Sequence, residues 1–150
     1  MLIEVYIDGA CEPVNPGGVG TWGYVIYIEE ILWDKQYGVV GEGRGISNNV
    51  AEYSALIHAL EKLIEANITR EPVIVYSDSN LLVNQMSGRW AAKGGMYYRY
   101  YKKARKLKIF FRNIRFVWIP REKNKEADEL TRKAYEEYRK SKESERPHKI

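Results

Sequence analysis

Cysteine and histidine are scarce in this 150-residue chain, which has one cysteine and two histidines. The single cysteine, Cys11, cannot form an internal disulfide, so we expect a reducing, cytoplasmic setting. A hydrolase triad is not expected, because His58 falls on a polar helical face and His148 falls near the end of the chain. No apolar run is long enough to span a membrane and no signal-peptide pattern is present, so we expect no membrane association.

Acidic residues are missing from residues 79–121, although the whole chain has 20 of them. The formal net charge of +4 therefore hides an asymmetry. Residues 1–88 hold four Lys or Arg against twelve Asp or Glu, a balance of −8, and residues 89–150 hold twenty against eight, a balance of +12. This division suggests metal-binding carboxylates beside a surface for a polyanion, and a generally charged surface is the alternative.

Hydrophobic patterning predicts an α/β fold. The expected strands cover residues 2–9, 21–28, 31–40, 72–78 and 113–120. The expected helices cover residues 50–66, 80–86, 96–107 and 126–139. The length is that of one domain, which we place at residues 1–139, followed by a charged, loose tail over residues 140–150.

Two acids in the first half stand at informative positions. Asp8 ends the first predicted strand, and the next residue, Gly9, has no side chain to block a metal ion or phosphate; an Asp-Gly turn is the simpler alternative. Glu52 lies within about 40° of Leu56 and Leu63 on a helical wheel. A carboxylate in such an apolar stripe is costly unless something pairs with it. The helix dipole explains the place of Glu52 along the helix but not its direction.

Two further acids complete a candidate set. Asp78 follows a buried strand, at the end where α/β sheets bind ligands, although it could instead cap the next helix. Asp128 falls in the first turn of the last helix, where the dipole alone would favour an acid. If the four acids converge, their repulsion calls for a cation, and oxygen ligands favour Mg²⁺ or Mn²⁺ over zinc.

Such a set suits phosphoryl chemistry. Paired divalent ions can activate water and stabilise the leaving oxygen of an in-line displacement. A glycosidase needs only two carboxylates and does not account for the basic half of the chain.

Basic and aromatic residues alternate in the stretch without acids. Residues 96–107 interleave tyrosines with Lys and Arg, and Arg89, Trp90 and Lys93 precede them. The cations can neutralise phosphates and the aromatic faces can stack on sugars or bases, so these three residues are substrate-binding candidates. Gly9 is a further candidate because it leaves room for a phosphate beside Asp8. The alternative is that the tyrosines belong to the core and the cations are merely solvated; we expect the tyrosines to be mixed.

Four motifs in order resemble ribonuclease H, type 1: YIDGAC at 6–11, NNVAEY at 48–53, YSDSN at 76–80 and NKEADEL at 124–130. The similarity extends through nearly the whole chain, to about residue 139. It implies a five-stranded mixed sheet of order 3-2-1-4-5 with helices around it. It also implies metal-dependent endonucleolytic cleavage of the RNA strand of an RNA–DNA hybrid, leaving 5′-phosphate and 3′-hydroxyl ends.

The resemblance assigns roles to the acids. Asp8 would bridge two Mg²⁺ ions, with Mn²⁺ as a substitute. Glu52 and Asp78 would complete the site of the ion on the leaving-group side. Asp128 would help to hold the ion that activates water.

The resemblance also implies substrate contacts. Asn48 and Asn49 match a pair at the minor groove near sugar hydroxyls, and Asn15 matches a second groove-binding asparagine. Ser47 matches a hydroxyl beside a DNA phosphate, and Asn80 stands where a substrate-binding glutamine is common. Reading 2′-hydroxyls would let the site tell RNA from DNA.

The sequence departs from the family pattern at two places. Many members have a histidine in the loop before the last carboxylate, and here Arg121, Glu122 and Asn124 are the candidates to replace it. The basic protrusion of some members is reduced to residues 89–95, so the helix over 96–107 would take over part of the binding.

The expected partner is an RNA–DNA hybrid, with double-stranded RNA as a second candidate, and we expect a monomer. Two other functions stay open. One is a relative that cuts DNA, as transposases and integrases do, and the other is a catalytically silent hybrid- or RNA-binding domain.

Overall fold

The sheet is mixed, because its first three strands are antiparallel and its last two are added in parallel. In the computed structural model, which describes residues 1–145, β1 (Ile3–Glu12), β2 (Val19–Ile28) and β3 (Ile31–Glu42) form the antiparallel part. β4 (Val73–Ser77) pairs in parallel with the other edge of β1, and β5 (Ile114–Trp118) pairs in parallel with β4. The order β3-β2-β1-β4-β5 confirms the predicted topology.

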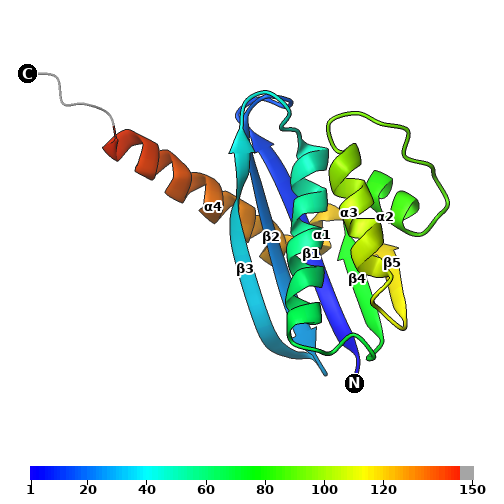
Figure 1. The fold of residues 1–150 in the computed structure, drawn as a ribbon. Coiled ribbons are helices and arrows are strands. Elements are labelled where there is room, and N and C mark those ends of the chain that lie inside the picture. Colours follow the sequence, from blue (N-terminus) through cyan, green and yellow to red (C-terminus); the bar gives the residue numbers. More distant parts are fainter. Residues whose placement is uncertain (146–150) are drawn as a thin grey trace, which may run out of the picture.

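Helices cover both faces of this sheet (Figure 1). α1 (Asn48–Glu65), α2 (Asn80–Met86) and α3 (Tyr98–Lys108) lie on one face, and α4 (Lys125–Ser144) crosses the other face over β1, β2 and β3. A short 3-10 turn, η1 (Arg121–Lys123), leads from β5 into α4. No helix within the described residues is both long and apolar enough to cross a membrane.

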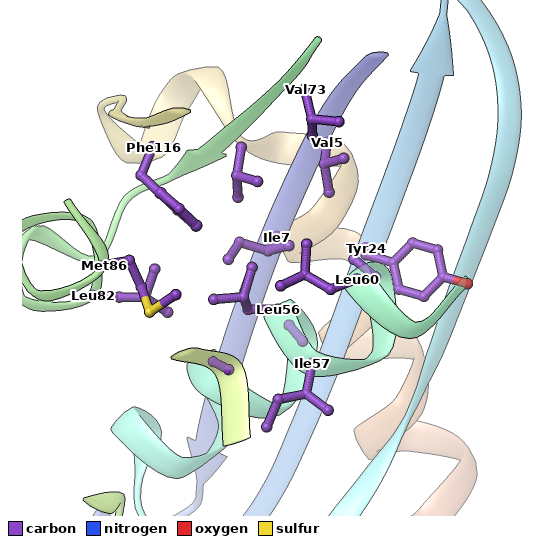
Figure 2. Packing of buried hydrophobic residues seen from close by; sticks show 14 of the residues in the cluster. Val5, Ile7, Tyr24, Leu56, Ile57, Leu60, Val73, Leu82, Met86 and Phe116 are labelled. Carbon is purple, nitrogen blue, oxygen red and sulfur yellow. The ribbon is translucent and has the colours of Figure 1, made fainter. Parts of the chain in front are cut away.

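The main core lies between α1 and the sheet (Figure 2). Alternate residues of β1, including Val5 and Ile7, are fully buried against Leu56 and Leu60 of α1. Each such side chain contributes roughly 1.5–3 kcal/mol of hydrophobic stabilisation. Because Glu52 precedes Leu56 by one helical turn, this packing also directs Glu52 toward the sheet.

The tyrosines around α3 divide between core and surface, as predicted. Tyr97, Tyr100 and Tyr101 pack against the core cluster, and Tyr97 stacks on Tyr53 of α1 with ring centroids 5.7 Å apart. The cations between them face outward, and only Ala104 of this helix is buried.

The prediction that Asp8 ends its strand is wrong. β1 continues to Glu12, because its pairing with β2 extends through Gly9 and on to Val19. The ladder with β4, in contrast, ends at Tyr6, two residues before Asp8. Asp8 therefore lies inside the ladder with β2 but beyond the end of the ladder with β4. Its backbone is unpaired on the β4 side because the parallel ladder stops at Tyr6.

α4 extends beyond the predicted end at residue 139 and reaches Ser144, so the first residues of the expected tail are helical. No glycine or proline interrupts residues 140–145, and Lys142 pairs with Glu145 at 3.8 Å along the same helix face. Figure 1 shows this end of α4 running out past β3. Pro147 and His148 lie outside the described residues. The domain boundary itself stays a prediction.

Candidate active site

A glycine allows α1 to approach the middle of β1. A Cβ atom on Gly9 would lie 2.3 Å from the backbone carbon of Ala51 and 2.3 Å from the backbone nitrogen of Glu52, which is far inside van der Waals contact. Gly9 therefore serves close packing as well as access to Asp8. The contact brings Glu52, the fifth residue of α1, to the strand that bears Asp8.

Three acids from separate elements converge at this point. Asp8 of β1, Glu52 of α1 and Asp78, which follows β4, each offer a carboxylate oxygen within 4.8 Å of the others. Asp8 is 6% exposed and Glu52 is 7% exposed, whereas Asp78 is half-buried. They share a pocket of about 310 Å³ with Asp128 and Arg121. The predicted convergence of the acids is therefore confirmed for these three.

The cluster makes ionisation of its members costly. Burial, followed by the charges of Asp78 and Asp128, raises the pKa of Asp8 to about 8. Burial, followed by the charges of Asp8 and Asp78, raises the pKa of Glu52 well above its ordinary value. The pKa of Asp78 is also raised by burial, and nearby Arg121 partly opposes this rise.

The residues present fit a divalent cation. The Oε2 atom of Glu52 is buried and has no hydrogen-bond partner among the described residues, although buried polar atoms are nearly always satisfied. A cation in the pocket would supply that missing partner and offset the repulsion among the carboxylates. The donors are all oxygens, the ligand type that Mg²⁺ and Mn²⁺ prefer.

Asp128 lies at the wall of the same pocket but is not one of the three closest acids. It stands in the first turn of α4, where the Nε and Nη2 atoms of Arg132 both lie 3.1 Å from its Oδ2 atom. We did not predict a role for Arg132 from the sequence. The signal that would have found it is the i,i+4 spacing of an acid and an arginine on one helix.

The three candidates to replace the family histidine lie in different surroundings. Arg121 lines the acid pocket, whereas Glu122 lines a separate cavity beside Tyr6 and Glu126. Asn124 is 1% exposed and donates from Nδ2 to the Ile7 carbonyl at 2.8 Å, which ties the start of α4 to β1. Of the three candidates, only Arg121 borders the carboxylates.

Two predicted groove residues lie at the rim of the pocket. Asn15 donates from Nδ2 to Oδ1 of Asn48 at 2.9 Å, and its own Oδ1 accepts from the Asn48 backbone N–H at 3.0 Å. Both line the pocket, and Asn49 follows them at the start of α1. Ser47 is buried and caps α1 by accepting from the Val50 N–H. Contact of these residues with a substrate stays a prediction.

The remaining predicted contacts lie around α2. Ser79 caps α2 by accepting from the Leu82 N–H, so Asp78 is not the cap. Asn80 begins the helix and accepts from the side chain of Asn84. The side chain of Asn84 in turn accepts from Arg89, and Trp90 and Lys93 are exposed nearby in sequence. Their role in binding also stays a prediction.

His58 stands apart from the acids, as its position on the polar helix face predicts. Its ring stacks on Trp22 with centroids 3.8 Å apart, and both residues line a different cavity from the acid pocket. Among the residues that the structure describes, no histidine therefore lines the acid pocket.

Comparison with known proteins places the chain in a family. A family model described as reverse transcriptase-like matches residues 17–134. The chain belongs to the reverse transcriptase-like family. Within this family, the predicted resemblance to type 1 ribonuclease H is confirmed by solved structures. The LC11 RNase H1, crystallised with an RNA/DNA hybrid, is 36% identical with a TM-score of 0.82, over 91% of this chain and 98% of that one.

A mycobacterial relative extends the comparison. The N-terminal RNase H domain of Rv2228c from Mycobacterium tuberculosis has a TM-score of 0.82 at 32% identity, over 93% of this chain and 97% of the solved one. The whole protein, named a bifunctional protein, is 35% identical over 137 residues, which is 89% of this chain. This chain thus spans about a third of the length of the mycobacterial relatives that it matches (35%).

Proposed function

We propose that this chain is a ribonuclease H, an endonuclease that hydrolyses the RNA strand of an RNA–DNA hybrid and leaves 5′-phosphate and 3′-hydroxyl ends. The observation that carries the proposal is the approach of Asp8, Glu52 and Asp78 to within 4.8 Å. Three buried or half-buried acids are destabilising in this arrangement unless a cation joins them. Family membership and the hybrid bound to LC11 RNase H1 support the choice of substrate.

The proposed cofactor is Mg²⁺, two ions in the presence of substrate, with Mn²⁺ as a substitute. When bound, such ions would activate water and stabilise the leaving oxygen. Asp8 would hold both ions, Glu52 and Asp78 would complete one site, and Asp128 would serve the other. Asp8 and Glu52 are almost fully buried, so little reorganisation of these ligands is needed during the reaction.

The proposed substrate contacts begin at the rim of the acid pocket and extend away from it. The hydrogen-bonded pair Asn15 and Asn48 would present amide groups to sugar hydroxyls, which distinguish RNA from DNA. Asn49, Ser47 and Asn80 would extend this contact along the groove. A second surface with Arg89, Trp90, Lys93 and the cations of α3 would neutralise phosphates.

Cleavage of labelled duplexes by paired variants tests the proposal. With Mg²⁺, the wild-type protein should cut the RNA strand of a hybrid and leave an all-DNA duplex intact. Glu52→Gln should lower the rate by about a thousandfold or more, because it neutralises a proposed ligand. Glu65→Gln changes an exposed acid on the same helix and should leave the rate unchanged.

Other outcomes would select another function. Preferential cutting of all-DNA duplex would favour a transposase-like nuclease. Binding of the hybrid without cleavage in Mg²⁺ or Mn²⁺ would favour a binding domain. Cleavage of double-stranded RNA in the same assay would widen the substrate range. A monomer in gel filtration and recovery from the cytoplasmic fraction would complete the proposal.

A further inference from the structure

Asp128 already has a cationic partner on its own helix. The guanidinium of Arg132 approaches one carboxylate oxygen, Oδ2, with Nε and Nη2 both at 3.1 Å. The Asp128 side chain is 20% exposed and the Arg132 side chain is 68% exposed. A pair this open to water is held weakly, typically by no more than about 1 kcal/mol, so either partner can be exchanged at low cost.

A second cavity begins where the acid pocket ends. Its volume is about 520 Å³, and Asp128 and Arg121 line both this cavity and the acid pocket. Arg132 and Tyr135 line only the larger cavity. Arg132 therefore has Asp128 on one side and, on the other, a cavity with a further arginine, an aromatic ring and two acids, Glu12 and Glu136. Among these groups, the two arginines suit a phosphate and the aromatic ring suits its attached sugar or base.

We propose that Arg132 is a positioning residue that exchanges Asp128 for a substrate phosphate. Without a metal ion, Arg132 neutralises Asp128. When a divalent cation binds Asp128, the two cations repel each other, and Arg132 turns to a phosphate of the polynucleotide in the larger cavity. This inference rests on the proposed function and adds a device that couples the metal occupancy of Asp128 to substrate binding.

The exchange follows from competition for one group. Arg132 and the cation would require the same carboxylate, and the Coulomb repulsion between them is strong at short range. A phosphate in the larger cavity offers the guanidinium a new charge-assisted partner. Metal and substrate should therefore bind cooperatively, because each removes a cost from the binding of the other.

Metal titration without nucleic acid provides the first test. Calorimetric titration of Mn²⁺ into Arg132→Gln should show about two- to fivefold tighter binding than in the wild type at the site that includes Asp128. The reason is that the cation that competes for Asp128 has been removed. Arg132→Lys keeps the charge and should lie near the wild type. Lys140→Gln removes an exposed cation on the same helix that lines neither cavity, and it should change nothing.

Hybrid binding provides the second test. In Ca²⁺, with a hybrid of fixed length, Arg132→Gln should reduce the slope of log affinity against log salt by about 1, the loss of one phosphate contact. Its KM should rise more than its kcat falls. Lys140→Gln should keep the wild-type slope. Thermal unfolding of each variant checks that the fold is retained.

The outcomes separate this inference from the proposed function. If the wild type cleaves the hybrid but Arg132→Gln binds Mn²⁺ with equal or lower affinity, Arg132 is only structural and the exchange is wrong. An unchanged salt slope would also overturn it. If the wild type neither binds Mn²⁺ nor cleaves the hybrid, the proposed function itself fails, and the exchange fails with it.

Discussion

The acid pocket buries charged groups of one sign, whereas the surface of α3 exposes charged groups of the other sign to solvent. In the pocket, like charges are gathered and buried, and one oxygen of Glu52 has no hydrogen-bond partner within residues 1–145. On α3, all the cations except the half-buried Lys108 are exposed, and several lie over aromatic rings. Arg99 is 5.0 Å from the centroid of Tyr100, and Lys102 is 5.2 Å from that of Tyr98. Exposed cations over aromatic rings cost little and can still reach a polyanion.

This difference separates two kinds of functional surface. Burying like charges lowers stability, so an arrangement of this kind persists when a ligand compensates for it. Spreading charge over an exposed helix has no such cost, and its contribution is screened by salt. Removing a carboxylate charge from the pocket should therefore affect catalysis and stability in opposite directions, whereas changes on α3 should affect mainly substrate affinity.

The largest expected effect is that of Asp8→Asn. This change should lower the cleavage rate by about four orders of magnitude, more than Glu52→Gln, because Asp8 is the proposed ligand shared by both ions. In the absence of metal it should raise the free energy of unfolding by roughly 1 kcal/mol or more, since it removes a buried like charge. Cleavage assays and chemical denaturation measure the two effects. A variant that is inactive and also less stable would contradict this picture of the pocket.

Metal and pH should act together on the stability of the wild type. The pKa of Asp8 is about 8 in the folded protein and near its ordinary value when unfolded, so the folded state binds the proton more tightly. Its contribution is fully present below pH of about 4 and is lost as the pH rises to about 8. Thermal unfolding of metal-free protein across this range should show the loss.

Added Mg²⁺ should reverse that loss at high pH. At a hundredfold excess over its dissociation constant, the ion should add about 2.7 kcal/mol, or roughly 5–10 °C in Tm. In Asp8→Asn, both the pH dependence and the response to Mg²⁺ should be much smaller. An equal response in the two proteins would place the metal elsewhere.

The packing of α1 on β1 should be sensitive to one methyl group. Gly9→Ala places a Cβ atom on the Ala51 and Glu52 backbone, which cannot yield as a flexible side chain could. We expect a loss of roughly 1–3 kcal/mol in stability and a fall in activity as Glu52 shifts. Chemical denaturation and cleavage assays measure this, with Ser141→Ala, an exposed change on α4, as the control. Wild-type stability in Gly9→Ala would mean that α1 can move away freely.

The smallest effect is expected on α3. Replacing Lys102, Lys103 and Arg105 by glutamine should weaken hybrid binding and lower its salt slope by about 2, with kcat nearly unchanged. The expected change is below three because Lys103 is also paired with Glu61 at 3.5 Å.

A matched control removes three cations from the acidic half of the chain, at Lys35, Lys62 and Arg70. It should leave the salt slope near that of the wild type, because none of these lies in the basic stretch. Equal slopes for both triple variants would mean that the cations of α3 are ordinary surface charges.

The sequence by itself determined the strands, the helices and the burial of Glu52, because these depend on local periodicity. The apolar neighbours of Glu52 on a helical wheel predicted that its side chain points inward. The place of Asp78 at the end of the fourth predicted strand predicted that it lies at the ligand-binding end of the sheet. Where pairing between strands decides the outcome, local pattern failed: β1 extends past Asp8 because β2 offers partners as far as Val19.

Only the tertiary structure decided which acids meet and what each one contacts. Sequence spacing cannot reveal that Gly9 makes room for the α1 backbone, or that Asp128 stands at the wall of the acid pocket. Both depend on how far apart two packed elements lie, which is set by side-chain volumes summed over the whole interface. Local sequence patterns predict the direction of a side chain. Its distance from residues remote in the chain is determined only by the packing of the whole molecule.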